Sequence, residues 1–113
     1  MYNLAKQSQQ TAMTSVHVNP DSTTTVVGTV LAKDDSCTSP DGSTECLLKT
    51  QVGKDVVYVV YNYNGSKICL NETATGVGGK KRVNDHIQVY GAYQQSENRN
   101  LINTCPFNDY YIK

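Results

Sequence analysis

The chain has 113 residues, of which 38% are hydrophobic, and this length suits one domain with a single core. Its ten basic and ten acidic side chains cancel, which excludes a global electrostatic attraction to nucleic acid or anionic membranes, so any polyanion site has to be local. No stretch approaches the roughly 18 uninterrupted apolar residues of a membrane span.

Residues 1–21 are rich in Gln, Ser, Thr and Asn, with few apolar side chains. Leu4, Ala5 and Ser8 share one face of a short helix, although Ser8 adds nothing apolar to it. We therefore expect a flexible or short-helical N-terminal arm, followed by one domain over residues 22–113. An arm of this kind is also the expected remnant of a removed signal or membrane anchor.

From Thr23 onward the sequence is typical of an all-β domain, because β-branched and aromatic runs alternate with Gly, Pro, Asn and Asp clusters. The first predicted strand, residues 23–33, contains Gly28, and a glycine inside a strand indicates a bulge or a bend. In TECLLKTQV we expect Leu48 and Val52 to face inward, with Lys49 and Gln51 outward.

The run DVVYVVYNY, residues 55–63, is predicted as a central strand, since it is apolar on both faces. SKICLNE is expected to be extended, and TATGVGGKKR, residues 73–82, is expected to be a loop without helix. In the next strand, HIQVYGAY, the alternation places Ile87 and Val89 inward. LINTC and NDYYIK complete the predicted strands, and only the N-terminal arm is expected to hold helix.

Four cysteines form an even set, which is typical of disulfide-bonded proteins in oxidising compartments. Cys37 and Cys46 flank SPDG, whose turn brings two departing strands together, so we pair these two thiols. Elimination then pairs Cys69 with Cys105. The alternatives are a zinc site, for which the expected close Cys-x-x-Cys spacing is absent, and four reduced, inert thiols.

Three segments together resemble the OB-fold, a five-stranded barrel: VVGTVLA (26–32), VVYVVY (56–61) and RVNDHIQVYGAY (82–93). The resemblance covers about residues 23–112 and implies a small OB-fold-like barrel. It departs from the pattern between the third and fourth strands, where a helix is usual and this sequence has none of the expected signals. An immunoglobulin-like β-sandwich is the alternative, although seven strands would be crowded and the chain has no Trp.

GVGGKKR joins three glycines to the cations Lys80, Lys81 and Arg82, and we expect exposed backbone N–H groups and these side chains to hold an anion. A solvated connector is the alternative interpretation. Tyr61 and Tyr63 are expected to share one face of their strand, with Tyr58 on the other. Outward tyrosines beside Lys49 then form a stacking surface for bases or sugars, or serve only as good strand residues.

The sequence lacks the usual signs of an enzyme. Its two histidines, His17 and His86, are too few to indicate a dedicated site, and no catalytic motif, metal set or cofactor motif is present. Asn64-Gly-Ser and Asn71-Glu-Thr match N-glycosylation acceptors.

We therefore expect a non-enzymatic, extracytoplasmic binding domain (secreted, periplasmic or on the cell surface). Its expected partner is a protein, a glycan or a polyanion, bound through Lys49, Tyr61, Tyr63 and the basic loop. One alternative is an oligonucleotide-binding module, which the net charge and the cysteines disfavour. The other is a structural subunit of a surface assembly or pilus.

Overall fold

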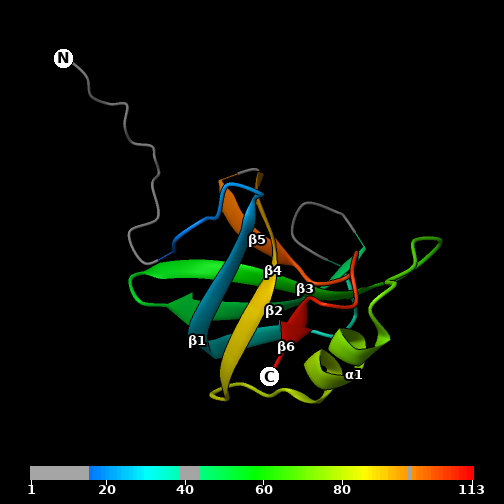
Figure 1. Ribbon diagram of the computed structural model, residues 1–113. Coiled ribbons are helices and arrows are strands. Elements are labelled where there is room, and N and C mark those ends of the chain that lie inside the picture. The colour runs from blue at the N-terminus through cyan, green and yellow to red at the C-terminus, as the bar shows by residue number, and fades with distance from the viewer. Residues whose placement is uncertain (1–15, 39–43, 97) are drawn as a thin grey trace.

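The structure is a computed structural model that describes residues 16–38, 44–96 and 98–113 (Figure 1). These residues form mainly β-strands with one helix, which confirms the predicted all-β barrel. The elements in chain order are β1 (Thr23–Asp34), β2 (Glu45–Val52), β3 (Asp55–Tyr63), α1 (Glu72–Lys80), β4 (His86–Ser96), β5 (Arg99–Asn103) and β6 (Tyr111–Ile112).

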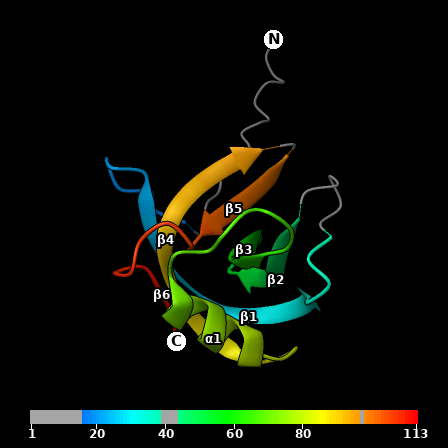
Figure 2. The ribbon, with the colours of Figure 1, turned by 90° about the vertical axis from the view of Figure 1, so that its right-hand side faces the viewer.

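Five strands close the barrel in the order β1-β2-β3-β5-β4, and β4 pairs back with β1, which rules out the alternative of a β-sandwich. The β3–β5 pairing is parallel and the others are antiparallel. A parallel pair cannot be joined by a tight hairpin. The chain therefore leaves the barrel after β3, forms α1 beside it and passes through β4 before it reaches β5 (Figure 2).

The predicted bend in the first strand lies at Gly28. Strand β1 pairs with β4 up to Thr29 and with β2 from Thr29 onward, so it changes partner one residue after the glycine. A Cβ atom at Gly28 would lie 2.4 Å from the carbonyl oxygen of Gln51. Only glycine lets β1 approach β2 this closely, and that approach closes the barrel at its corner.

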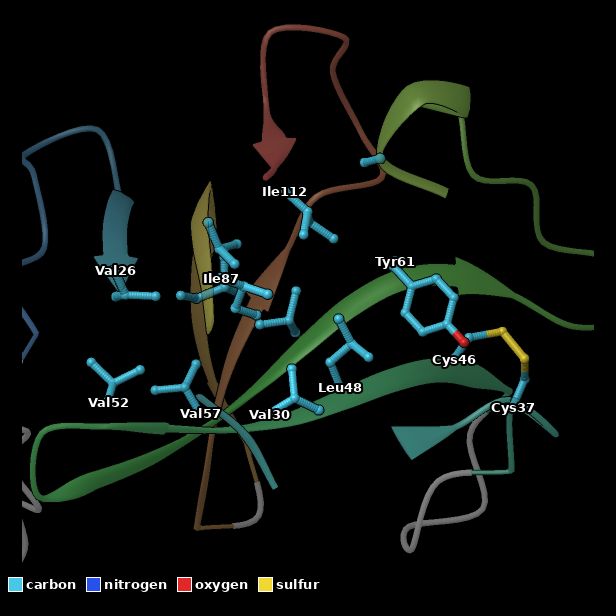
Figure 3. Packing of buried hydrophobic residues seen from close by; sticks show 14 residues of the cluster. Val26, Val30, Cys37, Cys46, Leu48, Val52, Val57, Tyr61, Ile87 and Ile112 are labelled. Carbon is cyan, nitrogen blue, oxygen red and sulfur yellow. A yellow bond between two sulfur atoms is a disulfide. The ribbon is translucent and has the colours of Figure 1, made fainter. Parts of the chain in front are cut away.

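The barrel interior is filled by side chains that alternate along each strand, as the sequence predicts for Leu48, Val52, Ile87 and Val89 (Figure 3). All four are buried. The helix closes this core with Ala74, and the cluster also contains Val26, Val30, Val57, Val59, Ile102 and Ile112.

The prediction that residues 73–82 form a loop is wrong, because most of them belong to α1. Contacts outside the helix stabilise both of its ends. Asn71 caps the N-terminus, and the Lys33 ammonium donates hydrogen bonds to the carbonyl oxygens of Gly79 (2.6 Å) and Lys81 (2.8 Å). These tertiary contacts outweigh the low helix propensity of the glycines. The segment SKICLNE is likewise not a strand: residues 66–71 lead from β3 to the helix, and Glu72 begins α1.

Two glycines of α1 differ in their surroundings, and this predicts opposite effects of the same substitution. A Cβ atom at Gly78 would lie 2.6 Å from Tyr61 Cβ, whereas one at Gly76 would meet no atom within 4 Å. We expect Gly78→Ala to lower the free energy of unfolding by about 1–3 kcal/mol through overpacking. Gly76→Ala should raise it by up to about 1 kcal/mol through helix propensity. Urea unfolding of both variants measures these changes. If both variants shifted the free energy of unfolding in the same direction, the close packing of Gly78 against Tyr61 would be contradicted.

Both predicted cysteine pairs, Cys37–Cys46 and Cys69–Cys105, are disulfide-bonded. No free cysteine remains among the described residues, so the four sulfurs are not arranged as a zinc site. The predicted turn at residues 39–42, between the first two cysteines, lies outside the described residues. The disulfides are consistent with an oxidising environment.

Part of the predicted N-terminal arm packs on the barrel. Val16 contacts the core cluster, and Val18 forms a bridge with Thr24. The Thr24 hydroxyl donates a hydrogen bond to the His17 carbonyl oxygen. Residues 1–15, where the short helix was predicted, lie outside the described residues. In the part of the chain that is described, no helix is long and apolar enough to span a membrane.

Candidate functional site

A second apolar cluster covers the outer side of β2, β3 and β5. Leu47, Val60 and Leu101 form it together with the Cys69–Cys105 disulfide, and Tyr58 and Tyr63 pack against it. Successive side chains of a strand point to opposite faces, so these residues lie on the side away from the barrel interior. This cluster is the base of the surface that we call the outer face.

A bulge in β3 decides which tyrosines reach the outer face. Leu47 pairs with Val60 and Cys46 pairs with Asn62, which leaves Tyr61 as the extra residue. The alternation therefore changes phase within the strand. Tyr58 and Tyr63 lie on the outer face, and Tyr61 points into the core, so the predicted grouping of Tyr61 with Tyr63 is wrong.

Tyr61 is 4% exposed and supports the fold instead of presenting its ring to solvent. Figure 3 shows it among the core side chains with the Cys37–Cys46 disulfide. Its hydroxyl donates a hydrogen bond to Asp35, and the hydroxyl of Thr75 donates one to its carbonyl oxygen. Burial, followed by the hydrogen bond to Asp35, raises the pKa of Tyr61 well above its usual value. Tyr61 therefore stays neutral and is not available to an external ligand.

A groove of about 300 Å³ lies on the outer side of β1, β2 and β3. The strand register explains its composition, because Ala32 pairs with Lys49 and Lys49 pairs with Tyr58 across the three strands. Lys49 thus lies outward as predicted, beside an aromatic ring. The groove is lined by Ala32, Lys33, Asp34, Thr38, Leu47, Lys49 and Tyr58.

Each outer-face tyrosine carries a cation over its ring. The Arg99 guanidinium carbon lies 5.2 Å from the centroid of the Tyr58 ring, and the Lys67 ammonium lies 4.6 Å from that of Tyr63. Such pairs are attractive, because the negative face of an aromatic ring attracts a cation. With Lys49, the outer face combines aromatic surface and positive charge.

The predicted anion site at Lys80, Lys81 and Arg82 keeps its cationic side chains but loses two of its expected backbone N–H donors. The backbone N–H of Lys81 donates to the Gly78 carbonyl oxygen (3.2 Å), and that of Arg82 donates to the Asp85 carboxylate (2.9 Å). The segment follows the C-terminal end of α1, where the helix dipole is negative. An anion can therefore meet these residues only through their side chains, which are exposed or half-buried.

Lys33 connects this basic segment to the groove. It lines the groove, and its ammonium donates to the Gly79 and Lys81 carbonyl oxygens. The structure thus brings Lys49 and Tyr63 to the outer face, whereas the Lys33 ammonium lies at the last turn of α1.

Tyr58, Lys67 and Arg99 are outer-face residues that the sequence analysis missed as ligand contacts. Apolar and polar residues do not alternate in β3, so its sequence does not show which face Tyr58 occupies. The pairing of Lys49 with Tyr58 was the available signal, since a strand predicted to face Lys49 outward also orients its neighbour.

Potential catalytic groups are sparse in the described residues. No group of three or more His, Cys, Asp or Glu side chains there is arranged to hold a metal ion. His86 uses its Nδ1 in a hydrogen bond with the Thr29 hydroxyl (3.0 Å).

Comparisons with models of protein families, with curated proteins and with solved structures find no match to this chain. No relative therefore assigns a ligand to the groove. The outer face itself combines aromatic rings, cations and an apolar base.

Proposed function

We propose that this chain is a non-enzymatic, extracytoplasmic binding domain whose ligand contacts the outer face of β2 and β3. The observation that carries the proposal is the pair of tyrosines, Tyr58 and Tyr63, each with a cation over its ring, beside a groove that contains Lys49. Aromatic rings offer flat apolar surface, and the cations attract negative charge. An acidic polysaccharide combines both properties and is the ligand class that these residues fit best.

Two disulfides support the extracytoplasmic part of the proposal. Disulfides persist in oxidising compartments and are rare in the reducing cytosol. The groove adjoins one of them, because Thr38 follows Cys37 directly. The disulfide holds Cys37 beside Cys46 at the groove edge, and an edge fixed before binding reduces the ordering cost of ligand binding.

The test is a calorimetric titration with a uronic-acid polysaccharide at low salt. Tyr58→Ala and Lys49→Ala should each weaken binding about fivefold to tenfold, since loss of one ring or one charge contact costs about 1 kcal/mol. Lys113→Ala is the matched control, because it removes a cation that lies over Tyr111, outside the groove. Equal affinity of all four proteins would overturn the assignment of the outer face.

An oligonucleotide-binding module of the OB type is the second candidate. The strand order β1-β2-β3-β5-β4 with a helix between β3 and β4 is compatible with an OB-like barrel. Tyrosines beside cations also suit stacked bases. A single-stranded oligonucleotide that binds more tightly than the polysaccharide, and loses affinity with Tyr58→Ala, would favour this candidate over the first.

A further inference from the structure

The two N-glycosylation acceptor sequences of this chain lie in opposite environments. Asn64-Gly65-Ser66 begins directly after β3, and Asn71-Glu72-Thr73 forms the start of α1. Both match the Asn-X-Ser/Thr pattern, so the sequence pattern does not distinguish one acceptor from the other. The fold distinguishes them.

Asn71 has no exposed surface, and its side chain is fully engaged. The two N–H groups of the amide nitrogen are shared among three carbonyl oxygens, those of Thr104 (2.9 Å), Phe107 (2.8 Å) and Tyr110 (2.8 Å). The amide oxygen accepts the N–H of Ala74 as the helix cap. A sugar on this nitrogen would displace the three carbonyl groups, so a chain modified at Asn71 is unable to adopt the fold.

Asn64 is exposed, as are Gly65 and Ser66. Its backbone N–H donates to the Thr44 carbonyl oxygen (2.7 Å), which holds the start of the segment against the chain before β2. Gly65 has a φ of 92°, and a Cβ atom there would meet nothing within 4 Å. The chain projects from the barrel at this point before it returns to α1 (Figure 1).

We infer that Asn64, and not Asn71, is the position at which the folded domain carries an N-linked glycan; the inference rests on the extracytoplasmic location in the proposed function. An oligosaccharyltransferase would supply the sugar from a polyisoprenoid diphosphate donor. The Asn64 amide nitrogen attacks the anomeric carbon, an N–C bond forms and the bond from that carbon to the diphosphate oxygen breaks. The amide proton leaves with the lipid diphosphate, and nothing is oxidised or reduced.

The position links the glycan to the outer face. Asn64 directly follows Tyr63, whose ring lies under Lys67. A glycan there borders one end of the outer face and leaves the groove at Lys49 and Tyr58 accessible.

The experiment is secretion of the full chain, with a cleavable signal added, from a eukaryotic host. Glycan sites are mapped by enzymatic release, which converts a glycosylated Asn to Asp. Ser66→Ala and Thr73→Ala each remove one acceptor sequence, and both replace exposed residues while leaving both asparagines in place. The wild type and Thr73→Ala should carry one glycan at Asn64, and Ser66→Ala should carry none.

A glycan on secreted Ser66→Ala protein, or its loss from Thr73→Ala, would overturn the inference. Secreted wild type that has both disulfides and no glycan would overturn it as well, while leaving the proposed compartment intact. Polysaccharide titration of unglycosylated protein tests the proposed ligand separately, so the two proposals fail independently.

Discussion

Replacing Asn71 with alanine is expected to lower the free energy of unfolding by about 3–4 kcal/mol. Its amide nitrogen serves three backbone carbonyl groups of the segment between β5 and β6, and its oxygen caps α1. One side chain therefore joins the helix to the C-terminal segment. Removal leaves three buried polar groups, the Thr104 and Tyr110 carbonyl oxygens and the Ala74 N–H, without this partner, and burying unsatisfied groups is costly. The shift of the urea midpoint at constant m-value measures the effect.

Two further variants separate the donors from the cap. Asn71→Asp keeps an acceptor for the Ala74 N–H but faces three carbonyl oxygens with a carboxylate, so it should destabilise at least as much as alanine. Thr73→Ala changes an exposed neighbour and should stay within about 0.5 kcal/mol of the wild type. If Asn71→Asp kept wild-type stability, the donor bonds would not contribute as described.

Removing the Cys69–Cys105 disulfide should cost about 4 kcal/mol, and removing Cys37–Cys46 should cost about 2.5 kcal/mol, in the chain-entropy account. The sequence separations are 36 and 9 residues, and the longer loop loses more freedom when it is closed. Each pair is replaced by two alanines, because a single substitution would leave a reactive thiol.

Chemical unfolding of the two double variants under non-reducing conditions provides the comparison. The wild type in reductant should unfold at a lower denaturant concentration than either variant, since it loses both bridges. A larger loss from the Cys37–Cys46 variant would contradict the loop-length argument. It would show that the short bridge acts mainly through native packing around Tyr61.

The inward and outward pattern of β2 and β4 was predictable because apolar and polar residues alternate there. Leu48 lies inside and its neighbour Lys49 outside, as the period of two requires. In β3 the same rule holds through Tyr61, which lies inside with Val57 and Val59, and fails between Tyr61 and Tyr63. The strand is apolar on both faces, so nothing in its sequence reveals the bulge, which arises from its register with β2.

The helix was missed because its stabilising contacts come from distant parts of the chain. Three glycines disfavour helix locally. Lys33 on β1 caps the last turn of α1. The Tyr61 side chain lies so close to Gly78 that no larger residue fits there. Asn71 is a residue type that commonly caps a helix, but the sequence does not reveal its bonds to residues 104, 107 and 110. The pairing that places Tyr58 beside Lys49 is local by contrast, because only two residues separate β2 from β3.

The closure of the barrel also bears on the solubility of the protein. The apolar run in β3 has the composition of an aggregation-prone segment, with high β-propensity and little charge. In the native state it is hydrogen-bonded to β2 on one side and β5 on the other. Strands paired on both sides offer little template for growth by edge addition. The rate of fibril formation should therefore rise with the fraction of molecules whose barrel has opened. Reductant, or loss of the Asn71 helix cap, should increase that fraction and accelerate fibril formation.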